Sequence, residues 1–235
     1  MKNSSVLSAL VGCFWLTGCG SGIDGNGHRV DEARETAAFS RVRSDASLDV
    51  KITQGDAPTV MVSIDSNLQR LVKTRIADDT LYIDLSDDIG DVVEGPHVLV
   101  TAPQLSAAKL AGSGNMTVAF EEPAQPLDLY LSGSGSIRFD GSTAALGAFL
   151  SGSGDIRLAG STSDADLKLS GSGSIRGQNL DSDSAAIVLS GSGDIAANVH
   201  DSVQVSLSGS GQIDLYGGAT IATLSHTGTG DINQH

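Results

Sequence analysis

The chain has 235 residues, of which 40% are hydrophobic and only 4% aromatic, and 29 are glycine, so any core must be aliphatic with a compact backbone. Lys and Arg total 14 against 28 Asp and Glu, which gives a net charge of -14. A surface this acidic repels nucleic acid at long range, so we expect no nucleic-acid partner.

The first 18 residues have the features of a lipoprotein signal peptide. Lys2 supplies a positive charge, and the apolar stretch "VLSALVGCFWL" (6–16) is too short to span a bilayer. It ends in Leu-Thr-Gly-Cys at 16–19, which resembles a bacterial lipobox and predicts lipidation of Cys19. The alternative is an ordinary secretory signal with a chance cysteine. Gly20 after the cysteine favours the outer membrane over the inner one.

Residues 19–38 are Gly-rich and then charged, without a sustained apolar period, which predicts a lipidated cysteine followed by a flexible tether. Residues 39–103 alternate apolar and polar side chains between turn signals, which is typical of strands. We expect an N-terminal β capping region here, with strands at 47–53, 59–65, 80–86 and 97–103.

Residues 104–235 contain an internal repeat with a period near 19 residues. Gly-Ser-Gly or Gly-Thr-Gly triplets begin at Gly112, Gly133, Gly152, Gly171, Gly191, Gly209 and Gly228. A flexible linker would carry no apolar register, whereas here aliphatic residues alternate with polar ones on both sides of each triplet. The alternation of apolar and polar residues is incompatible with helices and predicts that each repeat forms β-strands.

Strands that repeat at this spacing predict an all-β fold, a single-stranded parallel β-solenoid of about seven coils. One inward column would be Leu110, Leu131, Leu150, Leu169, Leu189, Leu207 and His226. A second would be Met116, Ile137, Ile156, Ile175, Ile195, Ile213 and Ile232. The glycines of each triplet would face inward, where the absent side chain lets the wall bend or approach the opposite wall, and the serines would face outward.

Three arginines occupy one outward position in successive coils. Arg138, Arg157 and Arg176 each follow the core isoleucine, and guanidinium groups bind carboxylates and phosphates bidentately. The sharper hypothesis is a binding site for an anionic glycan or phosphate. The simpler one is a solvated surface that Asp140 and Asp155 partly neutralise.

Other chemistry has weaker support in the sequence. Calcium-binding β-rolls use Asp-rich glycine repeats, but only three of the seven residues that follow the triplets are Asp. No nucleophile, phosphate-loop or zinc-helix motif occurs, so we expect no catalytic residue, cofactor or metal. A polysaccharide-active β-helix enzyme is the alternative function, and a calcium-binding β-roll comes third.

The segments "FSRVRSDASLDVKITQGDAPTVMVSID" and "LYIDLS", followed by serial "LSGSGDI" repeats, resemble the head GIN domain family of auto-transporter adhesins. The resemblance covers roughly residues 39–235 and implies a β-helical fold and an envelope location, without catalytic residues. We therefore expect a non-catalytic cell-envelope lipoprotein, a structural or adhesive module that faces the periplasm or the surface. Its partners would be the membrane, through the lipid on Cys19, and envelope or host glycans or envelope proteins.

Overall fold

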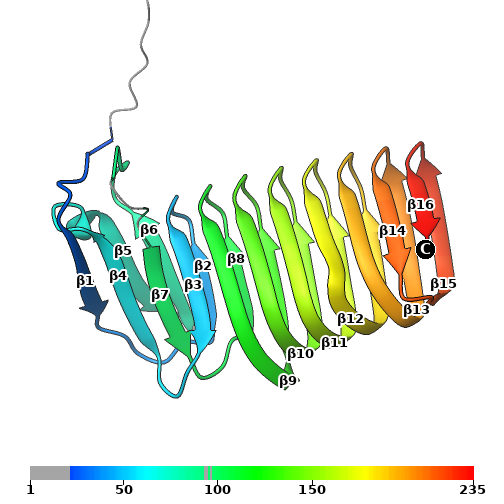
Figure 1. Cartoon of the computed structure of the whole chain (residues 1–235), viewed down its shortest axis with the longest axis horizontal. Coiled ribbons are helices and arrows are strands. Elements are labelled where there is room, and N and C mark those ends of the chain that lie inside the picture. Colours follow the sequence, from blue (N-terminus) through cyan, green and yellow to red (C-terminus); the bar gives the residue numbers. More distant parts are fainter. Residues whose placement is uncertain (1–21, 93–94, 96) are drawn as a thin grey trace, which may run out of the picture.

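The computed structural model describes residues 22–92, 95 and 97–235. These residues form an elongated β-solenoid whose strands stack along the long axis (Figure 1). The elements in chain order are β1 (Arg29–Arg34), β2 (Arg41–Ser44), β3 (Asp49–Gln54), β4 (Thr59–Asp65), the 3-10 turn η1 (Gln69–Leu71), β5 (Val72–Ala77), β6 (Thr80–Leu85), β7 (His97–Ala102), β8 (Ala107–Leu110), β9 (Asn115–Leu131), β10 (Ser136–Leu150), β11 (Asp155–Leu169), β12 (Ser174–Leu189), β13 (Asp194–Gly209), β14 (Gln212–Tyr216), β15 (Thr220–Gly228) and β16 (Asp231–Gln234).

The solenoid has two broad faces, which the long strands β9 to β13 both cross. The half of each coil after a glycine triplet joins the first face, in the order β1-β4-β7-β3 and then β9 to β13, β14 and β16. The half before the next triplet joins the second face, with β5, β6, β2, β8 and β15. Side chains from both faces fill the core between them.

The predicted inward columns are confirmed, because parallel pairing aligns the repeats one to one. Leu131, Leu150 and Leu169 pair in successive strands, and the column ends where Leu207 pairs with His226. The isoleucine column runs in the same way from Met116 to Ile232. Aliphatic side chains stacked at about 4.8 Å form a continuous apolar core, which the single coil could not bury alone.

One coil is inserted out of chain order. β2 and β3 form a coil that stacks directly on β8 and β9, with Val50 opposite Met116 and Ser44 opposite Leu110. On their other side β2 pairs with β6, and β3 pairs with β7. Residues 41–54 therefore lie between two segments that are adjacent in sequence, and part of the predicted capping region belongs to the solenoid itself.

The cap proper consists of antiparallel strands. β4 pairs antiparallel with β7, β5 with β6, and β1 with β4. The sequence predicts that 29–34 belong to a flexible tether, but these residues instead form β1, and Arg34 donates a hydrogen bond to the side-chain oxygen of Gln69 at 2.9 Å. A strand whose residues alternate only weakly in polarity has no apolar signal, so composition alone predicts a linker.

The glycines of the triplets allow close stacking of neighbouring coils. A Cβ placed on Gly154 would lie 2.2 Å from the carbonyl oxygen of Gly135 in the preceding coil, and one on Gly152 would lie 2.5 Å from that of Gly133. Backbone oxygens cannot move aside without shifting the coil. The sequence predicts that these glycines let the wall bend or approach the opposite wall. The close contact is instead with the preceding coil, along the stacking axis.

Candidate functional site

A column of basic side chains runs along the first face. Arg138, Arg157 and Arg176 pair with one another in β10, β11 and β12, as the sequence predicted. Thr117 of β9 pairs with Arg138, and Lys51 of β3 pairs with Thr117 on the other side. We call Lys51, Arg138, Arg157 and Arg176 the basic strip.

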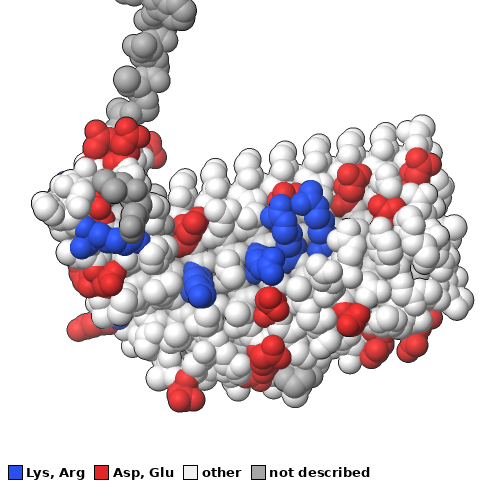
Figure 2. All heavy atoms as spheres, viewed as in Figure 1, with Lys and Arg blue, Asp and Glu red and all other residues white. Residues whose placement is uncertain are grey.

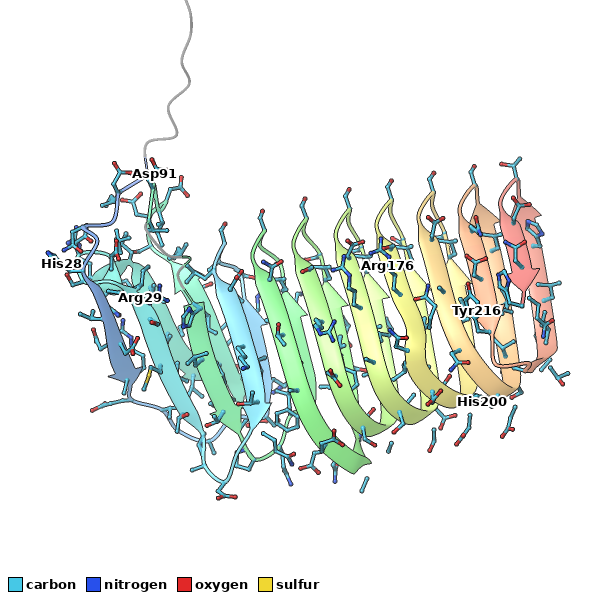
Figure 3. The ribbon with its side chains drawn as sticks, viewed as in Figure 1. His28, Arg29, Asp91, Arg176, His200 and Tyr216 are labelled. Carbon is cyan, nitrogen blue, oxygen red and sulfur yellow. The ribbon has the colours of Figure 1, made fainter. Side chains whose placement is uncertain are left out.

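The strip is the main concentration of positive charge on this face. Figure 2 shows blue side chains gathered over the middle of the solenoid, while the C-terminal end of the same view shows none. Figure 3 shows Arg176 projecting from the ribbon on this face. The distribution follows from the sequence, because no Lys or Arg occurs after Arg176.

Carboxylates neutralise the strip only in part. Arg157 lies 3.1 Å from Asp155, Arg176 lies 3.8 Å from the other oxygen of Asp155, and Arg138 lies 3.6 Å from Asp140. Two carboxylates thus serve three guanidinium groups, and each guanidinium keeps donors directed at solvent. The Arg138 side chain is 57% exposed.

The sequence alone does not indicate that Lys51 belongs to this column. Among the described residues no carboxylate lies within ion-pair distance of it, and its side chain is exposed. The alternation of Val50, Lys51 and Ile52 predicts that the Lys51 side chain points outward, but it does not predict which strand lies beside Lys51. Only the insertion of β3 beside β9 brings Lys51 into line with the arginines.

A polar ladder runs beside the strip, one position nearer the glycine turns. It consists of Asp49, Asn115, Ser136, Asp155, Ser174, Asp194, Gln212 and Asp231. One or two uncharged polar residues separate each carboxylate from the next: Asn115 donates to Asp49 at 3.0 Å, and Ser174 donates to Asp155. Carboxylates that are held apart in this way do not converge on one ion. In the described part of the chain no group of three or more His, Cys, Asp or Glu has the arrangement of a metal site.

The second face carries a ladder of outward side chains that contact one another, and it includes Tyr130, Phe149 and Lys168. The rings of Tyr130 and Phe149 stack with centroids 4.9 Å apart, and the Lys168 ammonium lies 5.2 Å from the centre of the Phe149 ring. Lys168 also donates to Asp166 at 2.6 Å, and the Tyr130 hydroxyl donates to Asp128 at 3.1 Å. Burial and this hydrogen bond raise the pKa of Tyr130. Both faces of the Phe149 ring are covered, so the ladder stabilises the stack more than it offers a binding platform.

The other candidates from the sequence that lie within the described residues do not come together in a site. Cys19, the predicted lipidation site, lies outside the described residues. His226 is exposed on β15 at the end of the leucine column. Tyr216 stacks on His235 with centroids 4.6 Å apart. Among the described residues no helix has the length and apolar character needed to cross a membrane.

Comparisons with known proteins place this architecture in a family. Residues 38–219 match the model of the family described as "Putative auto-transporter adhesin, head GIN domain". Since the match spans most of the chain, the protein belongs to this family, whose members are adhesin-like modules. Among curated proteins no relative matches the chain.

Solved structures share the fold. A "putative adhesin" from Bacteroides fragilis superposes with a TM-score of 0.83 at 21% identity, covering 91% of this chain and 100% of that one. A "putative adhesin" from Parabacteroides distasonis gives 0.70 at 21% identity, with 91% and 99% coverage. A "putative lipid binding protein" from the same species gives 0.67 at 24% identity, with 91% and 99% coverage. At these identities the likeness establishes the fold alone.

Proposed function

We propose that the protein is a non-catalytic module of the cell envelope, lipid-anchored at Cys19, whose basic strip binds an anionic glycan. The observation that supports this most strongly is the alignment of four cations on one face of a protein with a net charge of -14. A solenoid holds the backbone positions of these groups at a fixed spacing of about 4.8 Å per coil, so no backbone order must be created on binding.

The geometry of the strip suits a polymer with repeated negative charges. Each guanidinium has a planar set of donors that can bind a carboxylate, sulfate or phosphate through two hydrogen bonds. The strip lies along the stacking axis, so an extended chain would contact several coils in turn. Asp155 neutralises part of Arg157 and Arg176, which favours ligands of high charge density over weakly charged ones.

The test is binding of the purified protein to an array of envelope and host glycans, lipopolysaccharide and peptidoglycan. The triple variant Arg138→Ala, Arg157→Ala, Arg176→Ala should bind at least about tenfold more weakly, because it loses several charge-assisted contacts. Wild-type binding should weaken as salt rises, because screening acts on exposed charges.

The matched control removes three exposed cations at another place. Arg70→Ala, Lys73→Ala, Arg75→Ala changes the net charge equally but alters η1 and the edge strand β5, away from the strip. Equal loss in both triple variants would mean that only net charge matters. Binding that survives the loss of the three arginines of the strip would contradict the assignment of the site.

The anchor is tested separately. Cells supplied with labelled palmitate should incorporate label into the wild-type chain, and Cys19→Ser should abolish incorporation and release the protein from the membrane fraction. Cys13→Ser is the control, because this cysteine lies within the predicted signal peptide. Unchanged labelling of Cys19→Ser would contradict lipidation at this residue.

A further inference from the structure

The column that carries the basic strip continues toward the N-terminal cap with apolar side chains. Lys51 of β3 pairs with Leu99 of β7, Leu99 pairs with Met61 of β4, and Met61 pairs with Ala33 of β1. Met61 is 39% exposed and Leu99 37% exposed, and Ala33 is also exposed. We call Ala33, Met61 and Leu99 the apolar patch.

Neighbouring exposed hydrophobic side chains are unusual in this molecule. Among the described residues only five large hydrophobic side chains are exposed, and two of them, Met61 and Leu99, lie side by side in the line of the basic strip. A single exposed hydrophobic residue needs no explanation, but adjacent ones on a regular sheet point to something that covers them.

A hollow joins the patch to the strip. Its volume is about 280 Å³, and its lining includes Lys51, Leu99, His97 and Thr117. Asp49 also lines it, and its carboxylate accepts hydrogen bonds from the backbone and side chain of Asn115. A cation and an apolar wall therefore border the same depression. A second cation lies beside it, because the Arg29 guanidinium reaches across Ser63 at 2.8 Å and lies 2.7 Å from Nδ1 of His97. Figure 3 shows Arg29 at this N-terminal end of the molecule.

At this end of the strip, a ligand that is anionic along its whole length would leave the apolar patch in water, and an apolar ligand would leave Lys51 without a counter-charge. From the junction of the two surfaces we propose that the site accepts an anionic amphiphile, a lipid with a phosphorylated head group. The phosphate would lie on Lys51 and the neighbouring end of the basic strip, with the first methylene groups of an acyl chain against Leu99 and Met61. This inference rests on the proposed function, because it uses the cations of the same strip, and it assigns to the Lys51 end a second class of anionic ligand besides the glycan.

The experiment measures binding of three soluble probes to the purified protein by titration calorimetry. Dihexanoyl phosphatidic acid carries both parts of the proposed ligand, glycerol phosphate lacks the acyl chains, and dihexanoyl phosphatidylcholine lacks the net negative charge. Dihexanoyl phosphatidic acid should bind about tenfold more tightly than glycerol phosphate, which is the gain expected from burying about two methylene groups.

Variants separate the two parts of the site. Leu99→Ser should remove the advantage of dihexanoyl phosphatidic acid over glycerol phosphate and leave the affinity for glycerol phosphate unchanged, and Met61→Ser should act in the same direction. Leu224→Ser is the control, because this leucine is exposed at the other end of the solenoid. Thermal melts of all three variants establish that each is folded.

The outcomes also separate this inference from the proposed function. If dihexanoyl phosphatidic acid does not bind, or binds the Leu99→Ser variant as tightly as wild type, the amphiphile site is wrong. In that case glycan binding that depends on Arg138, Arg157 and Arg176 would still support the proposed function. Loss of both kinds of binding would overturn both.

Discussion

The turn between the two faces of the solenoid differs between the repeat coils and the coil formed by β2 and β3. In the repeats, the turn between the two faces carries glycine at two positions, as at Gly112 and Gly114. In the coil formed by β2 and β3, the equivalent positions are Ala46 and Leu48, both buried. The Cβ of a residue at 112 would lie 2.2 Å from the carbonyl oxygen of Ala46, and at 114 it would lie 2.1 Å from that of Leu48.

The difference between these coils lies in what precedes them in the stack. Each repeat turn lies against the turn of the coil before it, whereas β6 and β7, which precede β2 and β3, are joined by residues 86–96 without a glycine triplet. Glycine is therefore required by the neighbouring turn and not by the turn's own conformation. In the coil of β2 and β3, which does not follow a glycine triplet, the buried side chains of Ala46 and Leu48 extend the core.

The largest effect should follow from placing even a small side chain in a repeat turn, at the position where the coil of β2 and β3 carries Leu48. Gly154→Ala places a Cβ 2.2 Å from the oxygen of Gly135 and should lower the free energy of unfolding by about 3 kcal/mol, the upper range for overpacking. Urea denaturation measures the change. The neighbouring Ser153→Ala is the control, since Ser153 is exposed. A midpoint unchanged by Gly154→Ala would refute the close-stacking explanation.

Replacing a side chain by glycine in the coil of β2 and β3 should have a smaller effect. Ala46→Gly removes one buried methyl group and adds freedom to the unfolded chain, so it should cost about 1 kcal/mol. The same denaturation experiment applies. A stability gain from this substitution would mean that the first coil also prefers glycine, and the contrast between the two coils would fail.

The last coil provides a third comparison, because Leu224 of β15 pairs with the buried Val205 but is itself 56% exposed. Leu224→Ala should change the free energy of unfolding by no more than about 0.5 kcal/mol, as for other exposed positions. A loss similar to that of a buried leucine, about 3 kcal/mol, would show that this end is covered in solution.

The smallest effect concerns the pH dependence of the same end. Burial opposes ionisation of Asp214, but hydrogen bonds from Gln212, Asn233 and His235 outweigh it and lower the pKa of Asp214. A carboxyl with a lowered pKa stabilises the fold above its unfolded pKa, and this contribution disappears as the pH falls through the folded pKa. Asp214→Asn should therefore reduce the loss of stability below about pH 4, measured by melting curves across pH. An unchanged acid profile would exclude this contribution.

Much of the structure of the repeat could be predicted from the local pattern of apolar and polar residues. Alternation around each triplet determines which side chains face inward, and a constant period places equal positions above one another. For that reason the columns of Leu150 and Ile156, and the arginines at 138, 157 and 176, were predicted in register. The same argument identified strands near 59–65 and 97–103 but could not identify β1, whose sequence is mostly polar.

The sequence by itself determined the repeat with its strands, its inward columns and the three aligned arginines, because period and alternation are local properties. Tertiary structure alone decided that β3 lies between β7 and β9. Backbone hydrogen bonds at a strand edge do not distinguish one partner from another, so the choice depends on the packing of whole coils. That choice places Lys51 beside Thr117 and Leu99, and so joins the basic strip to the apolar patch.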